Sequence, residues 1–150
     1  MRGSVTSTEV AEAIERHREL FLEAGIQQDD VAPEEVVEYF SGETPTGDTT
    51  TLDDVITHQW LLLHEMAELK HLKIKGHTIT RDLIWNAYDD VLEAHFAATA
   101  LELKMALRHN DNDWIAIRVK QIPDWLEDED MPDRFKKSCK TIIKHYGTAP

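Results

Sequence analysis

The feature that most constrains this chain is a set of apolar residues that recur at alternating spacings of three and four along one segment. Its members are Ile84, Ala87, Val91, Ala94, Ala98, Leu101 and Met105. Because this spacing follows one face of an α-helix, we expect a helix over about 80–108. Phe96, Leu103 and Leu107 add apolar surface on other faces. The second half of this helix is therefore expected to be central and buried.

A second long helical segment precedes it. Thr51 or Asp53 can cap a helix that runs to about Lys73, and Gly76 then interrupts the pattern. Two long helices joined by only a few residues form an antiparallel hairpin. The sequence thus predicts an all-α helical bundle built around a hairpin of about 52–73 and 80–108.

The remaining segments also favour helices. We expect them over about 7–24, 33–42 and 132–146, with a loop over 43–51 and a solvated turn over 127–130. Residues 113–122 fit a helix or a strand equally well, and Pro123 is expected to close the element in either case. The chain is read as one domain, with acidic helices and a loop in 1–50, the hairpin in 51–108 and the last helices in 109–150.

Size and charge limit the possible functions. The chain has 150 residues, 17.3 kDa and a formal net charge of −13, which disfavours binding to nucleic acid or to a membrane surface. Residues 1–54 hold 3 basic and 14 acidic side chains, a net charge of −11. The single cysteine, Cys139, and the lack of an apolar amino-terminal run predict a cytoplasmic setting with no membrane span.

Acidic residues on the two hairpin helices form the main candidate site. Glu65 and Glu68 lie about 60° apart on the first helix. The second helix carries an acidic stripe of Asp82, Asn86, Asp89, Asp90 and Glu93. If the chain turns near Gly76, Glu65 and Glu68 lie level with residues 85–89, so that the carboxylates face each other. Such carboxylates need a divalent cation between them, and oxygen ligands suit Mg²⁺ or Mn²⁺.

Two motifs on these helices resemble those of a known superfamily. His64-Glu65-Met66-Ala67-Glu68-Leu69 and, after it, Asn86-Ala87-Tyr88-Asp89-Asp90-Val91-Leu92 resemble the Glu-x-x-Glu and Glu-x-x-Asp signature of all-α NTP pyrophosphatases. This superfamily includes MazG-like proteins, dimeric dUTPases and phosphoribosyl-ATP pyrophosphatases. Two positions depart from the signature: His64 stands where an acid often precedes the first glutamate, and Asn86 replaces the leading glutamate of the second motif.

The resemblance implies a Mg²⁺-dependent enzyme that cleaves a nucleoside triphosphate to a monophosphate and pyrophosphate. It assigns catalysis to Glu65 and Glu68, which would bind the metal together with Asp89. Asp90 or Glu93 would support them. Asn86 would orient a ligand or water, and the neighbouring Trp85 could stack on the base of the nucleotide.

A triphosphate also needs basic groups near its phosphates. Residues 134–144 contain five basic side chains and no acid, and we expect Lys136, Lys137 and Lys140 to bind the phosphates. The other candidates lie near the hairpin turn. They are Lys70, Lys73, Lys75 and Arg81.

Two other functions fit the same residues. One is a helical interaction module without chemistry, which would use the acidic amino-terminal third or the basic last helix. The other is a di-metal helix bundle, because Glu68-x-x-His71 has the spacing of such sites. Three more histidines lie nearby in the sequence, namely His58, His64 and His95, although a second Glu-x-x-His is missing. In this chain we expect His95 and Glu102 to form a hydrogen-bonded core pair. A homodimer is expected as well, because the apolar segment 94–107 must be covered on several sides.

Overall fold

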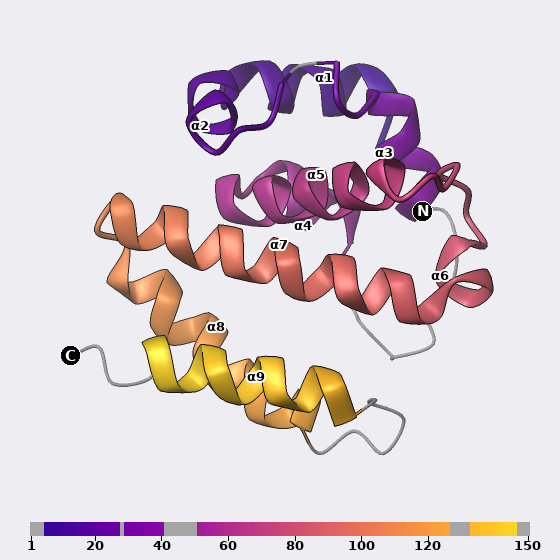
Figure 1. The fold of residues 1–150 in the computed structure, drawn as a ribbon. Coiled ribbons are helices and arrows are strands. Elements are labelled where there is room, and N and C mark those ends of the chain that lie inside the picture. The colour runs from indigo at the N-terminus through magenta and orange to yellow at the C-terminus, as the bar shows by residue number, and fades with distance from the viewer. Residues whose placement is uncertain (1–4, 28, 41–50, 127–132, 147–150) are drawn as a thin grey trace.

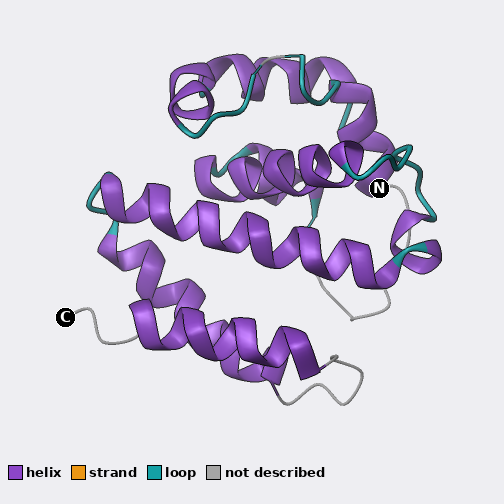
Figure 2. Ribbon diagram, in the orientation of Figure 1, coloured by secondary structure: helices purple, strands orange, loops and turns teal. Residues whose placement is uncertain are grey.

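The computed structural model describes residues 5–27, 29–40, 51–126 and 133–146. Within these ranges all of the regular structure is α-helix, as Figure 2 shows, and the helices pack into a bundle (Figure 1). The predicted all-α fold is therefore confirmed. The loop predicted over 43–51 lies outside the described residues except for its last member, and the turn predicted over 127–130 lies wholly outside them.

The amino-terminal helices are α1 (Ser7–Arg16), α2 (Arg18–Glu23) and α3 (Pro33–Phe40). Thr6 caps α1 in a capping box with Glu9, whose backbone N–H donates to the threonine hydroxyl at 3.2 Å. The helix predicted over 7–24 is interrupted at His17, which separates α1 from α2. Gly25 ends α2 with φ +85°, a backbone conformation that favours glycine.

The first arm of the hairpin consists of α4 (Leu52–Ile56) and α5 (Gln59–Ile74). Thr51 caps α4, as predicted. The break between the two helices is local in origin: the Thr57 hydroxyl donates to the carbonyl of Asp53 at 2.9 Å, and His58 Nδ1 accepts from the backbone N–H of Trp60 at 3.3 Å. Such side-chain bonds to the backbone compete with a continuous helix.

The second arm consists of α6 (Leu83–Asn86) and α7 (Tyr88–Arg108). Ala87, with φ −138° and ψ 47°, separates the two, so the long helix begins eight residues later than the sequence pattern predicts, at 88 instead of 80. Asn110 follows the end of α7 with φ 60°, and the Asp111 backbone N–H donates back to the carbonyl of Ala106 at 2.8 Å.

The chain ends in α8 (Asn112–Leu126) and α9 (Asp133–Tyr146). The ambiguous segment 113–122 is thus a helix. The expectation that Pro123 closes it is wrong, because α8 continues to Leu126. A proline disfavours the interior of a helix, because it lacks a backbone donor and crowds the preceding turn, but it does not have to end the helix.

Helix α7 lies in the middle of the bundle. In Figure 1 it passes between α5 on one side and α8 and α9 on the other, and it contacts all three. Most of its apolar side chains are buried, as predicted. The sequence led us to expect that a second copy of the chain covers this apolar helix. In the structure α8 and α9 cover it, and the homodimer stays a prediction.

Candidate metal centre

Three side chains from α5 and α7 meet inside the bundle. His64 and Glu68 lie one turn apart on the same face of α5, and His95 approaches them from α7. His64 Nε2 lies 3.1 Å from His95 Nδ1 and 3.4 Å from Glu68 Oε1, and these last two atoms are 3.2 Å apart. The three atoms form a nearly equilateral triangle, which we call the triad.

The triad has too few hydrogens for its three contacts. His64 Nε2 and His95 Nδ1 can each carry one hydrogen, and Glu68 Oε1 only accepts when it is ionised. If both nitrogens donate to Glu68, two N–H groups face each other across 3.1 Å. If His95 Nδ1 accepts from His64, its lone pair faces the carboxylate oxygen at 3.2 Å. With Glu68 ionised, no arrangement of the hydrogens places a hydrogen bond along all three sides of the triangle.

A metal ion placed between the three atoms would satisfy all of them at once. Ligand atoms that bind a metal at about 2.1 Å in tetrahedral or octahedral geometry lie about 3.0–3.4 Å from one another. The sides of the triangle are 3.1, 3.2 and 3.4 Å. Within the described residues, this is the cluster of histidine and acidic side chains with the geometry to hold a metal ion.

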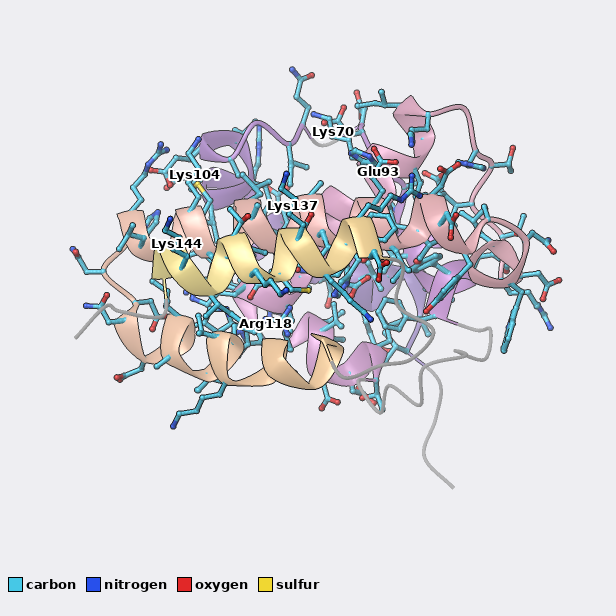
Figure 3. The ribbon with its side chains drawn as sticks, turned by 60° about the horizontal axis from the view of Figure 1, so that its bottom comes forward. Lys70, Glu93, Lys104, Arg118, Lys137 and Lys144 are labelled. Carbon is cyan, nitrogen blue, oxygen red and sulfur yellow. The ribbon has the colours of Figure 1, made fainter. Side chains whose placement is uncertain are left out.

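A second layer of side chains fixes His64. Glu102, fully buried on α7, accepts from His64 Nδ1 at 2.9 Å. The same carboxylate accepts from the indole N–H of Trp114 at 2.6 Å, and Arg118 Nε lies 2.8 Å from its Oε2. Both of these partners come from α8, and Figure 3 shows Arg118 on the side of α8 that faces α9. The tautomer and the ring orientation of His64 are thus set by a carboxylate that is itself held in place.

Glu68 is fixed from another direction. The Tyr39 hydroxyl, at the end of α3, donates to Glu68 Oε2 at 2.8 Å, which leaves Oε1 for the triad. Only 4% of Glu68 is exposed. Burial and the charge of Glu68 raise the pKa of Tyr39 far above its usual range, so this hydroxyl keeps its proton.

Opposite charges balance within this buried network. Burial alone would lower the pKa of His64, but its hydrogen bonds with Glu102 and Glu68 outweigh burial and raise the pKa to about 10. Burial alone would raise the pKa values of Glu68 and Glu102, but the bonds from His64 leave both below the usual range. Burial lowers the pKa of His95, which is therefore neutral at pH 7. Without a metal, the His64 and Arg118 cations balance the two carboxylates.

The predicted ligands Asp90 and Glu93 lie apart from the triad, at the turn end of the hairpin. Lys75 Nζ donates to Asp90 Oδ1 at 3.3 Å and also to Glu93 Oε2. His77 Nε2 is 2.7 Å from Asp90 Oδ2, and His71 Nε2 is 3.8 Å from Glu93 Oε1. A lysine ammonium thus stands between these carboxylates. The structure also separates the two members of the Glu68-x-x-His71 motif.

The other predicted site residues are dispersed. Trp85 and Asn86 are exposed on α6, and Asp89 is exposed with its carboxylate 3.6 Å from Arg134. Glu65 is partly buried on α5. Lys137 and Lys140 are exposed on α9, and Lys136 lies 3.8 Å from Asp133. Of the predicted catalytic and metal residues, Glu68 alone belongs to the triad.

The register of the hairpin explains this difference. The prediction placed the turn at Gly76 and began the second helix at about residue 80, which set Glu68 level with residues 85 and 86. In the structure residues 75–87 are occupied by a turn, the short α6 and the break at Ala87. Glu68 therefore lies opposite His95, two and a half turns further along the second arm. The expectation that the two acidic stripes face each other is wrong for this reason.

The alternative of a di-metal helix bundle, which rested on histidines, predicted more of the site than the acidic motifs did. His64 and His95 were named as nearby histidines, and both belong to the triad. His58 instead stacks on Trp114, with 4.2 Å between ring centroids. The predicted pair of His95 and Glu102 is mediated by His64, which lies between them. The sequence analysis missed Tyr39, Trp114 and Arg118, which come from other helices and have no fixed spacing to the triad.

Comparison of the chain with protein-family models, curated proteins and solved structures finds no match. The resemblance to all-α NTP pyrophosphatases thus stays a prediction carried by the two motifs. Among the described residues, no helix has the length and apolar character needed to cross a bilayer.

Proposed function

We propose that this chain is a helix-bundle protein that binds one divalent transition-metal ion through His64 Nε2, Glu68 Oε1 and His95 Nδ1. The observation that carries the proposal is the triangle of these atoms, whose sides match metal–ligand geometry and whose hydrogen bonds cannot all be made. A cation at this point would bind all three atoms at once, which no arrangement of the hydrogens achieves.

The second layer supports the same function. Histidines that bind metals commonly donate their other ring N–H to a carboxylate, which orients the ring and strengthens the ligand. Glu102 has this relation to His64, with Nδ1 and Oε1 2.9 Å apart. Trp114 and Arg118 then neutralise and orient Glu102. The arrangement positions His64 before a metal arrives.

The donor atoms favour particular metals. Two imidazole nitrogens and one carboxylate oxygen suit Zn²⁺, Co²⁺ or Fe²⁺ better than Mg²⁺, which prefers oxygen ligands. The Mg²⁺ or Mn²⁺ predicted from the acidic motifs is tested in the same titrations. Three protein ligands leave at least one position on the metal for water or a substrate, which is the condition for metal-assisted hydrolysis.

Pyrophosphate release from nucleoside triphosphates is the second candidate. Two observations favour it: Glu68 belongs to both the predicted motif and the triad, and the first turn of the basic α9 packs on α7 at Phe96, the chain neighbour of His95. There Phe135 stacks on Phe96, with 5.4 Å between ring centroids. An anion bound at the metal would have lysines of α9 on the same side of the bundle. Absence of pyrophosphate release across a panel of triphosphates with Mg²⁺, Mn²⁺ or Zn²⁺ contradicts this candidate.

Calorimetry on chelator-treated protein tests metal binding directly. We expect one equivalent of Zn²⁺ or Co²⁺ to bind, and His95→Ala to weaken the affinity by at least about tenfold. His95 is the preferred target because 30% of its side chain is exposed, whereas His64 is fully enclosed. Saturation with metal at about one hundred times the dissociation constant should stabilise the fold by roughly 2.7 kcal/mol.

His109→Ala is the matched control. His109 is a half-exposed histidine that pairs with Glu23 at 2.6 Å, remote in sequence from the triad. Its loss should leave metal affinity unchanged. A wild-type protein that binds none of these metals, or one whose affinity is equally insensitive to His95→Ala and His109→Ala, overturns the proposed function and leaves the cluster as a stabilising polar network.

A further inference from the structure

The two oxygens of Glu68 have different partners, and this difference bears on how the carboxylate can bind a metal. Oε1 lies in the triad, 3.2 Å from His95 Nδ1. Oε2 accepts the hydrogen bond of the Tyr39 hydroxyl at 2.8 Å. A carboxylate that binds a metal through both oxygens must turn both toward the ion. Glu68 can do so only by turning Oε2 toward the ion, and the bond from Tyr39 resists this rotation.

Tyr39 is held firmly enough to keep this position. It lies in the last turn of α3, whose Val36 is fully buried and which packs against both α1 and α5. Its ring meets that of Phe40 edge to face, with centroids 6.1 Å apart. Lys73 on α5 also binds Glu35 on α3 at 2.7 Å. The hydroxyl is therefore presented to Glu68 by a helix that is anchored to the same α5.

A carboxylate restricted to one oxygen favours some metals over others. With Glu68 bound through Oε1 alone, the triad supplies three ligand atoms, and one added water completes a tetrahedron. Zn²⁺ and Co²⁺ accept four ligands of this kind. Mn²⁺ prefers a larger set that is richer in oxygen, which a carboxylate bound through two oxygens helps to provide.

We propose that Tyr39 is a specificity-determining residue of the metal site, which holds Glu68 to a single metal bond and so selects Zn²⁺-like ions over Mn²⁺. This inference rests on the proposed function, since it concerns the metal bound by the triad. Tyr39 acts through Glu68 and is a positioning residue. Only the hydroxyl of its side chain is needed to position Glu68.

Tyr39→Phe tests the inference, because it removes the hydroxyl and keeps the ring. We expect the affinity for Zn²⁺ to fall about tenfold to hundredfold, as is usual when a partner of a metal ligand is lost. The affinity for Mn²⁺ should not fall with it, so the ratio of the two dissociation constants shifts by at least about tenfold. The visible absorption of the Co²⁺-loaded protein, intense in a tetrahedral site, should weaken as the coordination number rises.

Two further variants separate this effect from a general disturbance. Tyr88→Phe removes a hydroxyl from a partly buried tyrosine on α7 and should change neither the ratio nor the spectrum. Glu68→Gln offers a single oxygen in any orientation, so it should weaken Zn²⁺ and Mn²⁺ alike. An unchanged Zn²⁺ to Mn²⁺ ratio together with an unchanged Co²⁺ spectrum in Tyr39→Phe overturns the inference while the proposed function stands. Failure of the wild-type protein to bind Zn²⁺, Co²⁺ or Mn²⁺ overturns both.

Discussion

At the scale of single residues, His64 is the centre of the buried network. It contacts a carboxylate through each ring nitrogen, with Glu102 at Nδ1 and Glu68 at Nε2. Removal of one member of such a buried charged network leaves the others without a counter-charge and costs about 3–5 kcal/mol. These contacts therefore stabilise the fold without a metal, and they also orient the ring that the proposed metal site would use.

The protonation of His64 makes the stability of the metal-free protein depend on pH. Its pKa is about 10 in the folded state and 6.5 without the fold, so the folded form holds one more proton between these values. The resulting stabilisation is complete below pH 6.5 and is lost as the pH rises toward 10. Urea unfolding in the presence of a chelator should show the free energy of unfolding falling from pH 6.5 to 9.5.

The comparison of variants isolates this contribution. His64→Gln should flatten the fall between pH 6.5 and 9.5, and His109→Gln, at the exposed histidine, should leave it as in the wild type. Equal slopes in the wild type and His64→Gln would show that another group causes the dependence. The carboxylates make the stability depend on pH in the acid range. Because the pKa values of Glu68 and Glu102 are lowered, their stabilisation is lost only as the pH falls into acid.

At the scale of elements, helix ends decide where the hairpin residues meet. Local signals in the sequence predicted several of these ends: Thr51 caps α4, and Gly25 and Gly76 follow α2 and α5 with positive φ. They did not predict the break at Ala87, which has no glycine or proline nearby. The position of this break decides which residues of α7 lie opposite a given residue of α5. Because the break was not predicted, the prediction placed acidic residues where the structure has a histidine.

Gly76 is the position at which the turn of the hairpin depends most directly on residue type. Its φ is +97°, and the next residue, His77, donates its backbone N–H to the carbonyl of Leu72 at 3.1 Å. A Cβ at Gly76 would meet no atom within 4 Å, so Gly76→Ala strains the backbone without a clash. We expect it to lower the free energy of unfolding by about 1–2 kcal/mol, measured by urea denaturation.

Asn110→Gly provides the reverse test. Asn110 follows α7 with φ 60°, where glycine carries no side-chain strain, so this variant should be as stable as the wild type or more stable. A Gly76→Ala protein that unfolds at the same urea concentration as the wild type would contradict the role of positive φ at this turn.

At the scale of the whole molecule, charge is segregated. Residues 1–54 carry 14 of the 29 acidic side chains, whereas α9 exposes a row of lysines on the opposite side of the bundle from α1 and α2 (Figure 1). Figure 3 shows Lys137 and Lys144 along α9, with Lys104 of α7 on the same face. Phe135, Cys139 and Ile142 occupy the buried face of α9, which leaves its lysines toward solvent. Composition alone could not show which side of the bundle it faces.

The basic face of α9 gives a prediction for the triphosphate candidate. Phe135 stacks on Phe96, the chain neighbour of His95, so the first turn of α9 packs on the stretch of α7 that carries His95. A triphosphate bound at the metal carries about four negative charges that lysines can offset. Replacing Lys136, Lys137 and Lys140 together by alanine should raise the KM of triphosphate cleavage, and the effect should shrink at high salt because exposed charges are screened.

The control must remove the same charge elsewhere, since loss of any three cations makes the protein more repulsive to an anion. Exposed basic residues on other surfaces serve for this purpose: Arg16, Arg108 and Lys120. A general effect of net charge raises KM equally in both triple variants, whereas binding at α9 raises it only in the lysine variant. An unchanged KM in the lysine variant, with turnover present, would place the phosphates away from α9 and leave the turn lysines Lys70 and Lys75, which already bind Asp30 and Asp90.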